Sequence, residues 1–145
     1  MQVDIQVRDW RYYWRIWQLK SFCYKVIQNA WAGDEQAEVS VVLADDSFVQ
    51  SLNKKYRHKD KPTNVLSFEN EGLMAGDIVV AYQTTLREAK EKGISFQAHL
   101  AHLLTHGTLH LQGYDHLTDK QAEKMEHLEI KLLEKLGYQN PYKEI

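Results

Sequence analysis

The sequence is poor in cysteine and in long apolar runs, and each shortage excludes a class of protein. Cys23 is the only cysteine among 145 residues, which rules out a disulfide framework and a cluster of thiolate metal ligands. We expect Cys23 to be a small buried residue. No apolar run approaches the roughly 18 residues that cross a bilayer, and the start, MQVDIQVRDW, has neither a basic region nor a hydrophobic signal core. We therefore expect a cytoplasmic protein without a membrane segment.

The sequence also lacks a large excess of charge of either sign. Lysine and arginine number 18 against 20 acidic residues, giving a net charge of −2. This balance excludes a broad basic surface, so any phosphate binding must come from a local patch or a metal ion. What remains is the composition of an ordinary globular protein, with 43% hydrophobic and 26% charged residues. The length suits one domain with a sizeable core, and we expect a single domain over residues 1–145.

Periodicity and capping residues predict an α+β fold of four strands and about five helices. The predicted strands are residues 2–7, 37–44, 65–68 and 76–82. Two of the predicted helices span residues 10–31 and 96–111. A short helix runs from Asp45 or Asp46 through Leu52, another from Thr84 or Thr85 to Gly93, and the last from Thr118 to Leu136. The last helix carries a core stripe of Met125, Leu128, Leu132, Leu133 and Leu136.

Residues 106–116, HGTLHLQGYDH, have the spacing of a metal site. His106 and His110 are four residues apart and share one face of a helix. Gly113 can adopt a left-handed conformation and turn His116 back toward them. Three neutral imidazoles leave zinc one open position, which is typical of catalytic rather than structural sites. The alternative is a histidine-rich amphipathic helix packed against polar groups.

Neighbouring residues have more ordinary interpretations. We expect His99 and His102 to form hydrogen bonds that support the site, with His102 as an alternative ligand. His127 should lie on the surface, and Asp115 should form a turn. The metalloprotease pattern H-E-x-x-H needs a glutamate base where this chain has Gly107. Gly107 lies on the stripe of Leu100, Leu104 and Leu111, so we expect it to pack against the sheet.

The motif resembles the signature of the YbeY family of metal-dependent endoribonucleases. Similar segments follow in the family's order: NKKYRHKDKPTNVLSF at 53–68, GDIVVA at 76–81, the run from His99 to His116, AEKMEHLE and LGYQNPY. The resemblance implies a small mixed sheet, one zinc ion held by His106, His110 and His116, and Arg57 near the metal. It also implies cleavage of single-stranded RNA, maturation of the 3′ end of 16S ribosomal RNA and ribosome quality control. The implied partners are the small ribosomal subunit, ribosomal proteins and an assembly GTPase.

Two further segments bear on RNA. Lys54, Lys55, Arg57, Lys59 and Lys61 crowd one stretch with a single acid, Asp60. This is either a solvated basic loop or, beside a metal, a source of phosphate contacts in which Arg57 stabilises transition-state charge. We interpret the second segment, DWRYYWRIW at 9–17, as core and surface packing because its spacing is helical; the alternative is a base-stacking platform.

The hypothesis that fits these features is metal-assisted phosphodiester hydrolysis without a glutamate base. Two others stay open: a ribosome-assembly factor whose metal is structural, and a peptidase or other hydrolase. Three imidazoles also suit nickel, copper and iron.

Overall fold

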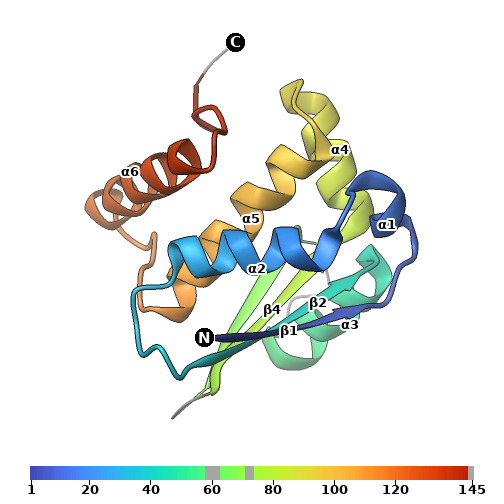
Figure 1. Cartoon of the computed structure of the whole chain (residues 1–145), viewed down its shortest axis with the longest axis horizontal. Coiled ribbons are helices and arrows are strands. Elements are labelled where there is room, and N and C mark those ends of the chain that lie inside the picture. Colours follow the sequence, from blue (N-terminus) through green and yellow to red (C-terminus); the bar gives the residue numbers. More distant parts are fainter. Residues whose placement is uncertain (58–62, 71–73, 144–145) are drawn as a thin grey trace.

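A four-stranded sheet with helices on both faces organises the chain (Figure 1). The computed structural model describes residues 1–57, 63–70 and 74–143. The strands are β1 (Gln2–Val7), β2 (Glu38–Ala44), β3 (Val65–Glu69) and β4 (Met74–Ala81), in the order β1-β2-β4-β3. β1, β2 and β4 run parallel, and β3 runs antiparallel to β4. The mixed four-stranded sheet of an α+β domain is therefore confirmed.

The described residues form six helices, one more than expected. They are α1 (Arg11–Arg15), α2 (Leu19–Ala30), α3 (Asp46–Arg57), α4 (Tyr82–Lys92), α5 (Phe96–Leu111) and α6 (Asp119–Lys135). Within the part of the chain that the structure describes, none of these helices has both the length and the apolar character that a bilayer crossing requires.

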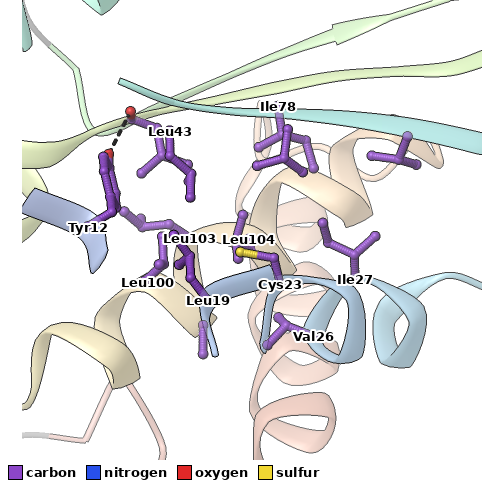
Figure 2. Packing of buried hydrophobic residues seen from close by; sticks show 14 of the residues in the cluster. Tyr12, Leu19, Cys23, Val26, Ile27, Leu43, Ile78, Leu100, Leu103 and Leu104 are labelled. Carbon is purple, nitrogen blue, oxygen red and sulfur yellow. Dashed lines mark hydrogen bonds between the residues drawn. The ribbon is translucent and has the colours of Figure 1, made fainter. Parts of the chain in front are cut away.

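Alternate residues of β4 separate the core into two clusters. Ile78 and Val80 belong to the larger one, which α2 and α5 cover; Figure 2 shows its side chains meeting between these helices and the sheet. Cys23 lies there, buried as predicted. Val79 and Ala81 point to the other face and pack with Val49 of α3. The period-two alternation of a strand thus places α5 and α3 on opposite faces.

The helix predicted over residues 10–31 is wrong, because two helices replace it. α1 ends at Arg15 and α2 begins at Leu19, with Gln18 between them in the left-handed region at φ 56° and ψ 50°. Tyr12, Ile16 and Leu19 are buried near this break. Trp10, Trp14 and Trp17 are exposed to solvent instead.

Four predicted boundaries, in three elements, are also wrong. α3 continues to Arg57 instead of ending at Leu52, so the first part of the predicted basic loop is helical. β4 begins at Met74 and ends at Ala81, and α4 begins at Tyr82 without a side-chain cap of its own. The carboxylate of Asp46 explains the early start, because it accepts hydrogen bonds from the backbone nitrogen and the hydroxyl of Thr84 at 2.9 and 2.7 Å.

The caps predicted around the histidine segment are confirmed. Ser95 accepts a hydrogen bond from the backbone nitrogen of Ala98 at 3.0 Å and starts α5. Thr118 and Gln121 form the capping box that starts α6. Both ends of the segment that carries the histidines are therefore fixed by local hydrogen bonds.

Candidate metal centre

α5 holds two of the three motif histidines in a fixed position. It is the central helix, with 12 of its 16 residues buried, so its side chains have little freedom to rotate. His106 and His110 lie one turn apart, and their Nε2 atoms are 3.0 Å apart. The helix thereby presents two imidazole nitrogens to the same point.

The chain turns back after α5 and brings in the third histidine. Gly113 has φ 94°, which favours glycine. Its N–H donates to the carbonyl of His110 at 3.0 Å, and the N–H of Tyr114 donates to that of Leu109 at 3.2 Å. His116 then returns toward the helix. One side-chain nitrogen from each of His106, His110 and His116 lies within 4.8 Å of the other two.

A buried carboxylate that the sequence interpretation missed orients the first of these rings. Glu129 of α6 accepts a hydrogen bond from Nδ1 of His106, another from Nε2 of His102 at 3.2 Å, and a third from the hydroxyl of Tyr142. Burial alone would raise the pKa of Glu129, but the hydrogen bonds from His102 and His106 outweigh burial and lower it to about 2. The ionised carboxylate can only accept, so the proton of His106 sits on Nδ1 and Nε2 faces His110 with its lone pair.

The surroundings also favour a neutral His110. Burial lowers the pKa of its ring, and the neighbouring rings of His106 and His116 lower it further. A neutral imidazole is the form that binds a metal. The site therefore favours, before any ion binds, the protonation state that a ligand needs.

The donor set fits a metal ion. Metal–nitrogen bonds of about 2.0–2.1 Å in a tetrahedral site separate the ligand nitrogens by about 3.4 Å, and the observed nitrogens lie within 4.8 Å of one another. Small side-chain rotations would close that difference. The histidine triad can thus hold one ion and leave a fourth position open.

His99 and His102 lie in hydrogen bonds beside the triad, as expected. Nε2 of His99 lies 2.8 Å from Oε1 of Glu88, and His102 bonds to Glu129. Neither belongs to the histidine triad. Asp115 accepts from the backbone nitrogen of His116 at 2.7 Å, as expected of a turn-forming residue. His127 is exposed, as expected.

Gly107 packs against the sheet as predicted. A Cβ atom at this position would lie 3.0 Å from Ile78 Cγ2 and 3.1 Å from the hydroxyl of Ser67 in β3. The position that carries the base in a metalloprotease helix therefore faces the core and not the triad. This orientation counts against the peptidase hypothesis.

The structure places only part of the predicted phosphate-binding group. Lys55 is exposed on α3, with its ammonium 5.2 Å from the centre of the Tyr56 ring. Arg57 is the last residue of α3, and its side chain is outside the described part of the structure. Lys59 and Lys61 lie outside the described residues. The roles of these four residues stay predictions.

The sequence did contain a signal for Glu129. Met125, Glu129 and Leu133 recur every four residues and are all buried, whereas Leu128, Leu132 and Leu136 of the predicted stripe are only half-buried. A carboxylate inside an apolar helical stripe needs a partner, and the nearby histidines are the obvious donors. No comparable signal marked Tyr142, which follows α6 in an irregular segment.

The fold and the triad together define a class: a small α+β protein whose three histidines can hold one metal ion with a position left open. Comparison with known proteins narrows this class. The family model described as "Endoribonuclease YbeY" matches residues 5–137. The chain therefore belongs to the YbeY endoribonuclease family.

Individual relatives agree with that assignment. A protein named Endoribonuclease YbeY from Methylocella silvestris is 54% identical over 114 residues, covering 75% of this chain and 65% of the relative. One of the same name from Rhizobium meliloti is 42% identical over 160 residues, covering 98% of this chain and 94% of the relative. A solution structure of a Thermotoga maritima protein superimposes with a TM-score of 0.64 at 28% identity, covering 93% of this chain and 89% of that one.

Proposed function

We propose that this chain is a zinc-dependent endoribonuclease that cleaves single-stranded RNA at the histidine triad. The observation that carries the proposal is the triad itself, in which three imidazole nitrogens converge while a buried carboxylate fixes the tautomer of one ring. Family membership supplies the substrate class, since relatives 42–54% identical are named endoribonucleases.

The protein groups have distinct tasks in this proposal. His106, His110 and His116 hold one Zn²⁺ ion, and Glu129 keeps Nε2 of His106 free by holding the proton on Nδ1. When bound, the ion supplies an activated water at neutral pH and a Lewis acid for the phosphoryl oxygen. Gly107 leaves no room for a glutamate base, and this chemistry needs none.

Arg57 binds the scissile phosphate and offsets the charge that develops on it, and Lys55, Lys59 and Lys61 bind neighbouring phosphates. The course of the chain supports this. The segment after α3 leads into β3, where the hydroxyl of Ser67 lies 3.4 Å from the carbonyl of Gly107 in α5. At the start of β3, Asn64 binds Glu88 at 3.0 Å, and Glu88 also holds His99. The basic segment thus joins a strand that lies along the histidine helix.

The family resemblance supports a role for this activity in ribosome maturation. We propose that the chain acts in the cytoplasm on the 3′ end of 16S ribosomal RNA and in ribosome quality control. Its partners would be the small ribosomal subunit, ribosomal proteins and an assembly GTPase.

The test is cleavage of a labelled single-stranded ribosomal RNA fragment by the wild type, His110→Ala and Arg57→Ala, with bound zinc measured on each sample. We expect cleavage to fall at least about 100-fold in both variants, with zinc lost only from His110→Ala. Lys131→Ala, an exposed residue of α6, serves as the control and should behave as the wild type. Equal cleavage by all four proteins would contradict the proposal and favour a binding factor with a structural metal.

A further inference from the structure

Four large aromatic side chains around α1 are exposed to solvent. Trp10, Tyr13, Trp14 and Trp17 are 66%, 57%, 79% and 87% exposed, and we call them the aromatic patch. Figure 1 shows α1 at one end of the molecule, away from α6. Exposed apolar patches on a protein surface often mark an interaction site.

The aromatic patch is not needed to bury α1. Tyr12 and Ile16, one helical turn apart, are the core residues of this segment. The hydroxyl of Tyr12 donates toward the carbonyls of Ala44 and Val80, each at 2.9 Å, and its ring contacts Phe96 at a centroid distance of 5.8 Å. The fold is thus anchored through the opposite face of α1, and the exposed aromatics add nothing to the core.

The backbone next to the patch adopts a conformation that is unfavourable for its residue. Gln18 is the only non-glycine residue with positive φ in the described part of the chain. It separates Trp17 from α2 and leaves that indole in solvent. A shallow hollow of about 500 Å³ lies at this break, lined in part by Tyr13, Trp17 and Lys20. Strained backbone that persists beside an exposed side chain is typical of binding sites.

The charges around the patch are positive although the whole molecule is slightly acidic. Residues 8–20 contain Arg8, Arg11, Arg15 and Lys20 against one acid, Asp9. Asp9 is held by Arg11 through a 2.6 Å ion pair. Arg15 and Lys20 are exposed and take no part in the salt bridges of the described residues, although Nε of Arg15 donates a hydrogen bond to the hydroxyl of Tyr82 at 3.0 Å. Aromatic rings interleaved with exposed cations match the bases and phosphates of single-stranded nucleic acid.

We infer that the aromatic patch binds single-stranded RNA by base stacking, with Arg15 and Lys20 contacting phosphates. This inference rests on the proposed function for the identity of the ligand. The patch is separate from the metal centre: α1 contacts Phe96 at the start of α5, and His106 lies ten residues further, about 15 Å along the helix axis. The patch therefore holds a part of the RNA distant from the cleaved bond.

The test measures RNA binding without cleavage. A fluorescein-labelled oligouridylate of about twelve nucleotides is titrated with the protein in EDTA, and anisotropy gives the Kd. We expect Trp14→Ala/Trp17→Ala to raise the Kd about tenfold or more, and Trp14→Phe/Trp17→Phe to restore most of the binding because phenylalanine still stacks. The control is Tyr24→Ala, which removes an exposed aromatic of α2 outside the patch and should leave the Kd unchanged. Thermal unfolding checks that each variant is folded.

An unchanged Kd in the double alanine variant would overturn the inference. So would an equal loss in Tyr24→Ala, or a wild-type dimer in sedimentation that Trp14→Ala/Trp17→Ala dissociates while RNA binding persists. That last result would assign the patch to a second copy of the chain. If the wild type binds RNA through the patch but does not cleave it with zinc present, the proposed function fails and the patch assignment stands.

Discussion

Glu129 fixes the tautomer of His106, one of the three candidate metal ligands. It lies fully buried between His102, His106 and Tyr142, and its negative charge persists because these neighbours donate hydrogen bonds to it. Fixing the His106 tautomer in advance removes a cost that metal binding would otherwise carry. Glu129, which the sequence interpretation missed, thus couples α6 to the histidine triad.

Replacing this carboxylate should weaken the site without removing a ligand. We expect Glu129→Gln to raise the Kd for zinc about 10–100-fold, because the amide offers one acceptor oxygen and its NH₂ group confronts the N–H of His102. A competition titration with a fluorescent chelator measures the change. Glu134→Gln, on the exposed side of α6, is the matched control. Equal zinc affinity in both variants would show that Glu129 does not position His106.

His99 gives the folded protein a pH-dependent stability away from the triad. Burial lowers the pKa of His99 below its usual 6.5, outweighing the hydrogen bond to Glu88. Its buried Nδ1 has no hydrogen-bond partner among the described residues, so a second proton there would be unsatisfied. The unfolded chain therefore takes up this proton first. The contribution of His99 to the free energy of unfolding is therefore complete above pH 6.5, and it is lost as the pH falls below that value.

We expect urea unfolding in EDTA to show a loss of stability between pH 7.5 and 5.5, with a slope of at most about 1.4 kcal/mol per pH unit from this group. His99→Gln should show a smaller slope, since glutamine keeps a donor toward Glu88 but does not titrate. The pKa of Glu88 is itself lowered from 4.5, by hydrogen bonds from His99 and Asn64 that outweigh burial, so Glu88 contributes only at lower pH. If the free energy of unfolding fell with pH equally in the wild type and in His99→Gln, this explanation would be contradicted.

At the residue scale, the sequence predicted what local spacing determines and missed what tertiary contact determines. The convergence of His106, His110 and His116 followed from a helical turn and one glycine. Glu129 lies 23 residues from His106 along the chain, and only the packing of α6 on α5 brings the two together. The same limit applies to Tyr142.

At the scale of elements, α5 combines two roles because its faces differ. One face carries the histidines, and the other packs on the sheet where Gly107 lets Ile78 and Ser67 approach closely. This division explains why the metalloprotease glutamate has no place in this helix. A side chain at position 107 would have to displace the core of β3 and β4.

Gly107→Glu is therefore expected to destabilise the protein by about 3 kcal/mol or more, since it buries a carboxylate against apolar atoms. It should not create peptidase activity. Urea unfolding and a peptide-substrate screen measure the two effects. Gln97→Glu, an exposed position near the start of α5, should change stability by less than about 0.5 kcal/mol. A stable Gly107→Glu protein would mean that this face of α5 is not packed as described.

α1 shows how an element can mislead sequence reasoning. The helical spacing of Trp10, Trp14 and Trp17 favours core and surface packing, but the structure exposes all three and buries Tyr12 and Ile16. Periodicity identifies a face of a helix; it does not say whether that face meets the core or a binding partner. The break at Gln18 had no sequence signal, because the residue is neither glycine nor asparagine.

At the scale of the whole molecule, the fold class and the four strands could be predicted, while the order of the strands could not. β4 lies between β2 and β3, and this arrangement depends on how α2, α3 and α5 divide between the two faces. Alternating apolar residues mark a strand without naming its neighbour. The even charge balance predicts local binding sites instead of a broad basic surface, and the triad and the aromatic patch are our two candidates.

The most direct test of zinc-dependent RNA cleavage at the histidine triad is to measure how the cleavage rate depends on zinc occupancy. Metal-free protein is titrated with zinc, and the cleavage rate of single-stranded ribosomal RNA is measured at each bound fraction, with His116→Ala in parallel. We predict that the cleavage rate rises in proportion to zinc occupancy, saturates at one ion per chain, and stays near zero in His116→Ala. Full cleavage by the metal-free protein, or a rate that ignores zinc occupancy, would contradict this prediction.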